Sequence, residues 1–168
     1  MQKVESRKSD KSARGNASQF FVAGELCRRD LVALVTVGNT PNTDILCSNK
    51  EGTKFVHIQV KTFVPGNRTC SVGLKSQKDY GNNFIWVLAG IPHAIQNKPF
   101  EYYVIPSRVV AENVSRAHKM WLSSEGKNGQ VHKDSSVRVI HLPPFKSCSG
   151  WSIEQYRDRW DVIEDLLK

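Results

Sequence analysis

A carboxylate, an amide and an ammonium group stand at positions in this sequence that would bring them together on one face of a folded sheet. Gln59 and Lys61 alternate with apolar residues, so on a β-strand their side chains would share one face with that of His57. If the segment that carries Asp44 pairs antiparallel with this strand, Asp44 lies near Gln59 and Lys61. The pattern therefore predicts polar groups that converge on one face of a sheet whose opposite face is apolar.

Groups of this kind are what phosphodiester hydrolysis requires. Mg²⁺ prefers hard oxygen ligands, commonly one or two carboxylates together with waters and substrate phosphate. The metal polarises the phosphate and lowers the pKa of a bound water, and a neighbouring lysine offsets charge in the transition state. We expect Asp44 to be the main ligand, the Val60 carbonyl to be another, and Lys61 to face the attacking water. On spacing alone, an ordinary solvent-exposed sheet face is the alternative.

The surrounding sequence predicts the strands that would position these residues. Segments rich in β-branched and aromatic residues are Thr43–Ser48, Lys54–Phe63, Cys70–Lys75, Asn83–Ala89, Phe100–Ile105 and Val137–Leu142. A hairpin-like turn, Asn49–Gly52, joins the first two. Ser107 is the expected N-cap of a helix that runs to about Leu122. This order predicts one mixed α/β domain with a largely continuous sheet.

Both ends of the chain have distinct patterns. Residues 1–17 are rich in Ser, Lys, Arg and Gly, which predicts a flexible basic tail ahead of a single domain over 18–168. Helical periodicity from Ser18 to about Val35 predicts one buried stripe, although the β-branched run 32–37 also fits a strand. The residues of that stripe are Phe20, Cys27, Leu31 and Leu34.

The last segment has the signature of a helix N-terminus. Ser152–Gln155 fits a capping box, with Trp151 and Tyr156 at the two staple positions. Apolar residues then recur at spacings of three and four, which predicts a helix with one buried face: Ile153, Tyr156, Trp160, Ile163 and Leu167. We assign this helix a structural role and no chemistry.

Composition limits the class of partner and compartment. The 168 residues carry a formal net charge of +8, which favours a polyanionic partner. No apolar run is long enough to span a bilayer and residues 1–17 lack a signal peptide, so we expect a soluble, cytoplasmic protein without membrane contact. The four cysteines form no CxxC pair, and buried reduced thiols are expected rather than a zinc site.

The string from Gly24-Glu25 through Asp44-Ile45-Leu46 to Gln59-Val60-Lys61-Thr62 resembles the PD-(D/E)xK nuclease superfamily. The likeness is to its restriction-endonuclease-like and Holliday-junction-resolvase-like members, here with a QxK variant of the motif. It implies a restriction-endonuclease-like α/β fold, with a core order α-β-β-β-α-β over residues 18 to about 123. A central mixed sheet would be flanked by helices, with an extra C-terminal helix.

The resemblance also implies an activity and a set of site residues. It implies a Mg²⁺- or Mn²⁺-dependent endonuclease acting on double-stranded or branched DNA, and a homodimer, since resembling nucleases often dimerise. The catalytic residues would be Asp44, Gln59, Lys61 and Glu25, with metal held by Asp44, Gln59, Val60 and Glu25. Weaker candidates for nucleic-acid contact are His57, Lys75 and Lys78.

Two departures from the family pattern keep other hypotheses open. Thr43 stands where the family often has proline, and Gln59 replaces a Glu or Asp, which removes a negative charge from the metal site. A catalytically weak or inactive DNA-binding module is therefore the alternative function, and an RNA or nucleotide hydrolase is not separated from a DNA enzyme. For Glu25, an exposed i,i+4 pair with Arg29 is the alternative role.

Overall fold

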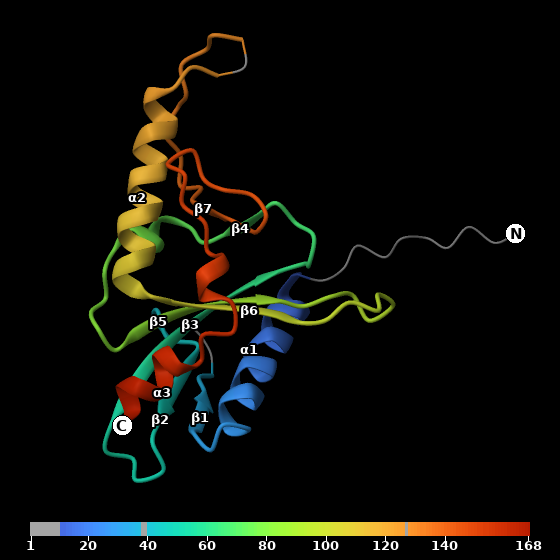
Figure 1. Cartoon of the computed structure of the whole chain (residues 1–168), viewed down its shortest axis with the longest axis vertical. Coiled ribbons are helices and arrows are strands. Elements are labelled where there is room, and N and C mark those ends of the chain that lie inside the picture. The colour runs from blue at the N-terminus through green and yellow to red at the C-terminus, as the bar shows by residue number, and fades with distance from the viewer. Residues whose placement is uncertain (1–10, 38–39, 127) are drawn as a thin grey trace, which may run out of the picture.

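The computed structural model describes residues 11–37, 40–126 and 128–168, which form a mixed α/β fold around a five-stranded sheet (Figure 1). A two-stranded sheet is the second one in the described part of the chain. In order the elements are α1 (Lys11–Cys27), β1 (Val32–Val35), β2 (Ile45–Ser48), β3 (Phe55–Phe63), β4 (Thr69–Ser71), the 3-10 helix η1 (Leu74–Gln77), β5 (Phe84–Gly90), β6 (Glu101–Pro106), α2 (Ser107–Ser123), β7 (Val139–His141), the 3-10 helix η2 (Glu154–Tyr156) and α3 (Asp161–Leu167).

The large sheet combines antiparallel and parallel pairing. Its strand order is β1-β2-β3-β5-β6, and every neighbouring pair is antiparallel except β3 and β5. Parallel neighbours need a long connection, and residues 64–83 supply one that contains β4 and η1. β4 pairs with β7 rather than with the large sheet. The predicted central mixed sheet is confirmed for five strands, and β4 and β7 form a separate two-stranded sheet.

α1 and α3 cover one face of the large sheet (Figure 1). Because successive side chains of a strand point to opposite faces, Val56, Ile58 and Val60 of β3 all reach this side and are buried. They belong to one apolar cluster with Val22 and Leu26 of α1 and with residues of α3. This cluster fixes which face of β3 carries the polar side chains.

α2 packs on η1, β5 and β6 at the opposite face. Phe84, Trp86 and Leu88 of β5 are buried there in a second apolar cluster that also contains Val110 and Val114 of α2. The polar side chains of β3 lie on this same face, because its alternate residues are register partners of those three β5 residues. These side chains are half-buried.

The first helix differs from the prediction at both ends. It begins at Lys11, so residues 11–17 are helical rather than part of the predicted tail, and residues 1–10 lie outside the described residues. It ends at Cys27, and Asp30, with a φ of 64°, turns the chain into β1. The strand alternative for the β-branched run is therefore confirmed.

The predicted stripe of that helix was wrong. Phe20 and Leu34 are exposed, whereas Val22 and Leu26 are buried against the sheet. The predicted stripe combined residues of a helix, a turn and a strand as though they formed one helix. It therefore did not identify the face of α1 that is buried. The face that α1 buries is instead set by its packing on the large sheet.

The C-terminal segment is not one capped helix. Ser152 Oγ accepts a hydrogen bond from Glu154 N–H at 3.3 Å, but η2 ends at Tyr156 and α3 begins only at Asp161. The interruption arises because the chain pairs there with β6, through an isolated bridge between Tyr103 and Arg157. The predicted capping box is therefore wrong. The burial predicted for the apolar residues is confirmed for Ile153, Trp160, Ile163 and Leu167, and Tyr156 is half-buried.

Ser107 begins α2 but does not cap it. Pro106 is the N-cap residue, and the Ser107 hydroxyl accepts a hydrogen bond from Tyr80 N–H at 2.8 Å. The side chain thus binds the segment before β5 instead of the first turn of its own helix. Among the described residues, no helix combines the length and the apolar character needed to cross a bilayer.

Candidate active site

The hairpin of β2 and β3 places Asp44 opposite Gln59. Asn49 Oδ1 closes the turn by accepting hydrogen bonds from the backbone N–H groups of Thr53 and Lys54, at 2.9 and 3.1 Å. The resulting antiparallel register pairs Ile45 with Ile58. One residue before β2, Asp44 N–H donates to the Ile58 carbonyl at 2.9 Å. The antiparallel pairing expected from the sequence is confirmed.

Asp44 is hydrogen-bonded through one carboxylate oxygen. Its Oδ2 accepts from the side-chain amide of Gln59 and from Val60 N–H, the latter at 2.7 Å. The Gln59 amide nitrogen also lies 3.5 Å from the Val60 carbonyl oxygen. No hydrogen bond from the described residues reaches Asp44 Oδ1. A carboxylate, an amide and a backbone carbonyl therefore meet at one point of the sheet, with one carboxylate oxygen still available.

Burial raises the pKa of the Asp44 carboxyl above the ordinary aspartate value. Four interactions oppose this shift: the Val60 N–H hydrogen bond, the positive charge of Lys61, the Gln59 hydrogen bond and the positive charge of Lys75. Partial desolvation strengthens the attraction of this carboxylate for any cation that enters. The lysine charges show that Lys61 of β3 and Lys75 of η1 both lie close enough to act on Asp44 electrostatically.

The weaker candidates lie at the margins of this cluster. His57 shares the polar face of β3, and its Nδ1 is 3.1 Å from Thr43 Oγ1. Lys75 is exposed on η1. Lys78 follows η1 and its ammonium lies 5.2 Å from the ring centroid of Tyr80. The cluster therefore contains Asp44, Gln59, Val60 and Lys61 at its centre, with His57 and Lys75 beside it.

Glu25 lies in a different cluster. Its carboxylate is 2.9 Å from the Arg28 guanidinium and 3.8 Å from that of Arg29, and Arg29 also pairs with Glu164 of α3 at 3.5 Å. Among the ion pairs and hydrogen bonds of the described residues, none joins Glu25 to Asp44. The expectation that Glu25 assists the metal site is not supported, because its position on α1 directs it into the α1–α3 ion-pair network.

Sequence reasoning missed Thr36, which holds the backbone of Asp44. Its N–H donates to the Asp44 carbonyl at 2.9 Å, and its hydroxyl donates to the Thr43 carbonyl at 2.7 Å. These contacts fix the residue that leads into β2 against the end of β1. The sequence around Thr36 does not reveal this role, because the pairing of β1 with β2 decides which backbone groups Thr36 contacts.

No family model and no curated protein matches this sequence. A solved structure does. The chain shares its fold with a bacterial homing endonuclease. That protein, I-Ssp6803I, superimposes with a TM-score of 0.52 over 93% of each chain, at 17% sequence identity. The likeness establishes that the two proteins share a fold, and it extends over almost the whole length of both chains.

In the described part of the chain, no three His, Cys, Asp or Glu side chains gather into a metal site. Asp44 is thus the acidic ligand that this cluster offers, and its neighbours are neutral oxygen donors. Mg²⁺ and Mn²⁺ accept such donors, since carbonyl and amide oxygens are hard ligands. The residues present fit a divalent cation of this kind, with a lower ligand charge than two carboxylates would supply.

Proposed function

We propose that the protein is a metal-dependent nuclease that hydrolyses phosphodiester bonds of DNA, a QxK variant of the PD-(D/E)xK type. The observation that carries the proposal is the meeting of Asp44, Gln59 and the Val60 carbonyl beside Lys61. The nuclease fold shared with a homing endonuclease supports it. The formal net charge of +8 suits a nucleic-acid substrate.

Asp44 Oδ1, the Val60 carbonyl and the Gln59 amide oxygen would hold the Mg²⁺ or Mn²⁺ ion. The Gln59 amide now directs its NH₂ group at Asp44. Because a primary amide carries a donor and an acceptor on the same carbon, rotation about its last bond replaces the nitrogen by the oxygen. The bound ion would polarise the phosphate and activate a water molecule.

Lys61 contributes a positive charge beside the scissile phosphate. It shares the β3 face with Gln59 and its charge acts on Asp44. A fixed ammonium at this point stabilises negative charge that grows on the phosphate oxygens, and it orients the attacking water. Lys75 would add a contact to a phosphate of the bound strand, because it lies exposed on η1 and its charge acts on the same carboxylate.

A non-catalytic DNA-binding module is the second candidate. It is favoured by Gln59, which stands where a second carboxylate would complete the metal site and which donates to Asp44. In such a protein the lysines would still bind phosphates, but the cluster would hold a cation too weakly for turnover. Both candidate functions would use the same surface to bind DNA. They differ in whether the cluster binds a metal ion tightly enough for catalysis.

The deciding experiment is incubation with supercoiled, linear, single-stranded and four-way-junction DNA in Mg²⁺ and in Mn²⁺. We expect cleavage by the wild type and a loss of at least about 10²-fold in Asp44→Ala and Lys61→Ala, with unchanged circular dichroism. Asp30→Ala and Lys50→Ala are matched controls, because these exposed side chains pair with each other at 3.5 Å. Cleavage by Asp44→Ala at the wild-type rate would refute the assigned site. DNA binding without cleavage in either metal would favour the binding module.

A further inference from the structure

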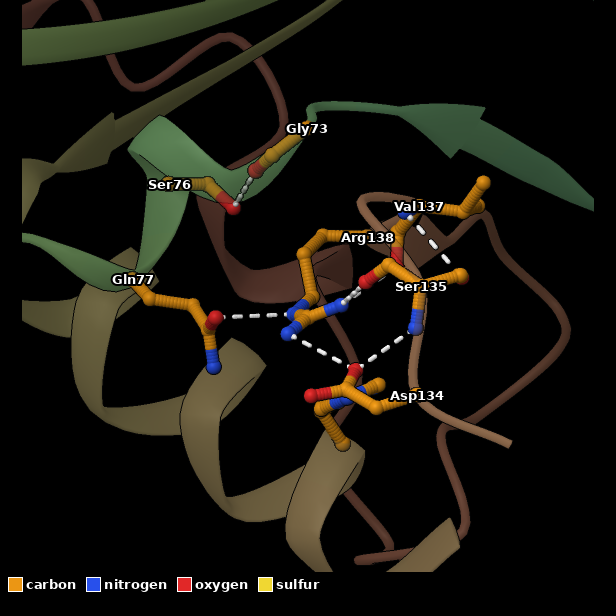
Figure 2. Close-up of polar contacts among 8 residues, drawn as sticks. Gly73, Ser76, Gln77, Asp134, Ser135, Val137 and Arg138 are labelled. Carbon is orange, nitrogen blue, oxygen red and sulfur yellow. Dashed lines mark hydrogen bonds and ion pairs between the residues drawn. The ribbon is translucent and has the colours of Figure 1, made fainter. Parts of the chain in front are cut away.

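A second polar cluster is built around a buried arginine, Arg138, next to η1 (Figure 2). The residue is 5% exposed and its guanidinium makes four contacts with oxygen atoms. Nε donates to Gln77 Oε1 at 2.8 Å, and Nη1 donates to the carbonyls of Ser135 and Val137 at 2.6 and 2.8 Å. Nη2 lies 3.4 Å from Asp134 Oδ1. The guanidinium charge is thus paired with the Asp134 carboxylate, and most of its N–H groups donate to oxygen atoms.

Arg138 holds η1 at both ends. Its backbone carbonyl accepts hydrogen bonds from Val72 N–H at 2.9 Å and Gly73 N–H at 3.3 Å, just before η1 begins. Its side chain reaches Gln77, the last residue of η1. Between these points, the buried Ser76 hydroxyl donates to the Gly73 carbonyl at 2.7 Å (Figure 2). One residue therefore fixes the start and the end of this 3-10 helix.

A helix of this kind needs outside support to hold a side chain in place. Its hydrogen bonds have poorer geometry than those of an α-helix, and runs longer than a few residues are uncommon. η1 has four residues, Leu74–Gln77, and Gly73 enters it with a φ of 69°, a conformation that favours glycine. Lys75 extends from the middle of this turn, so its position depends on the contacts at the two ends.

The cluster also contacts α2. On its far side, Asp134 Oδ1 also accepts from Ser135 N–H at 2.7 Å and lies 2.8 Å from His118 Nε2 of α2. These contacts tie Arg138 to α2, which packs on β5 and β6 of the large sheet. Through Arg138, η1 is thus fixed relative to the same sheet that carries Asp44 and Lys61.

We propose that Arg138 is a positioning residue which, through Gln77, fixes η1 so that Lys75 contacts a phosphate of the bound nucleic acid next to Asp44. The inference rests on the proposed function for its ligand, a nucleic-acid phosphate. Its structural step, the fixing of η1, does not depend on catalysis. Arg138 itself touches no substrate, because its guanidinium is buried and occupied by Gln77, Ser135, Val137 and Asp134.

The sharpest test removes only the contact with η1. Gln77→Leu abolishes the acceptor for Arg138 Nε and leaves the other guanidinium contacts in place. Asp134→Asn is the matched control, because it changes the same guanidinium's environment on the side away from η1. Hydrogen exchange should speed up in Gln77→Leu at the amides of Ser76 and Lys78, which donate within η1 at 3.1 and 3.2 Å. It should stay at the wild-type rate in Asp134→Asn.

The functional step is read from metal-free DNA binding across a salt series. Lys75→Ala should reduce the slope of log affinity against log salt by about one, as expected for one lost phosphate contact. Gln77→Leu should produce the same reduction, and the double variant should show no more than Lys75→Ala alone, since both act through one contact. A merely structural role for Gln77 would give additive losses instead.

Each result has a defined meaning. Unchanged exchange in η1 of Gln77→Leu would overturn the positioning role, whether or not the protein binds DNA. Faster exchange with additive losses of binding, or with no loss, would overturn the link to Lys75. Absence of DNA binding by the wild type would overturn the proposed function and the phosphate contact, and hydrogen exchange would still decide whether Arg138 fixes η1.

Discussion

Asp44 and Arg138 are both charged groups withdrawn from water, but their surroundings differ in kind. Arg138 is almost fully buried and most of its N–H groups have oxygen acceptors. Asp44 is half-buried, both hydrogen bonds of its carboxylate end on Oδ2, and burial raises the pKa of that carboxyl. The hydrogen-bonding groups of the arginine are therefore largely satisfied within the fold, whereas Oδ1 of the carboxylate accepts no hydrogen bond from the described residues.

The difference indicates which polar cluster is built to bind a ligand. Removing a satisfied buried charge leaves its partners without hydrogen bonds, so such a group contributes to holding the structure. A carboxylate that is desolvated and incompletely coordinated costs stability when it is ionised, and it gains from any cation that binds it. We therefore expect substitutions at the two sites to change stability in opposite directions.

The largest effect is expected for Arg138→Met. The change leaves Gln77, Asp134 and two backbone carbonyls without their buried donor, and the free energy of unfolding should fall by about 3–5 kcal/mol. Urea denaturation at neutral pH measures this loss. Arg108→Met is the control, since Arg108 is exposed and its contact with Glu112 is a surface ion pair, which contributes little to stability. Equal losses in the free energy of unfolding of the two variants would show that the buried Arg138 contributes no more to stability than a surface arginine.

Asp44→Asn should reduce the rate of cleavage by about 10²-fold or more. The same change should nevertheless stabilise the protein at neutral pH. Because the pKa of Asp44 is raised on folding, its contribution favours the folded state at acidic pH and is lost as pH rises through the raised pKa. The neutral amide avoids this loss. The gain in thermal midpoint over the wild type should therefore be present at neutral pH and shrink toward acidic pH. A destabilised Asp44→Asn at neutral pH would contradict the comparison.

Gln59→Glu sharpens the comparison by completing the acidic site. A second carboxylate should lower the Mg²⁺ concentration needed for half-maximal cleavage by roughly tenfold, because ligand charge tunes the affinity for hard dications. Metal-free DNA affinity should fall slightly, since a negative charge then faces the phosphates. A Mg²⁺ titration of cleavage, with DNA binding measured at fixed salt, tests both effects. A loss of DNA binding with no metal response would point to the non-catalytic module.

The smallest effect is expected for Glu25→Gln. Because Glu25 pairs with Arg28 and Arg29 rather than with the Asp44 cluster, the change should cost about 0.2–1 kcal/mol of stability. The Mg²⁺ dependence of cleavage should match that of the wild type. A changed Mg²⁺ dependence of cleavage in this variant would indicate that Glu25 contributes to the metal site.

The parts of the site that the sequence predicted are those set by local periodicity. Alternation along β3 places Gln59 and Lys61 on one face, and a short turn sets the register that brings Asp44 beside them. These relations involve residues 15 positions apart along one hairpin. The apolar composition of β5 and β6 likewise made their strands predictable, because both are buried.

The parts that escaped prediction depend on contacts between distant segments. Gln77 and Arg138 are 61 positions apart, and only the pairing of β4 with β7 brings them together. For Glu25, the i,i+4 pair with Arg29 that the sequence offered as the alternative role is confirmed, whereas the further ion pair of Arg29 with Glu164 depends on how α1 and α3 pack. The helix expected from Ser152 onward is interrupted because residues 157 and 158 bind β6. Tertiary packing decides each of these cases.

The parallel pairing of β3 with β5 has a consequence for the kinetics of folding. The β2–β3 hairpin closes through a short turn, and such hairpins form in about 1–10 μs. The β3–β5 pair must first close the long connection that contains η1, and non-local pairing of this kind is slow. We expect high φ-values for substitutions in the hairpin and low ones at Gln77. The metal-binding half of the proposed site would then form before the half that positions Lys75.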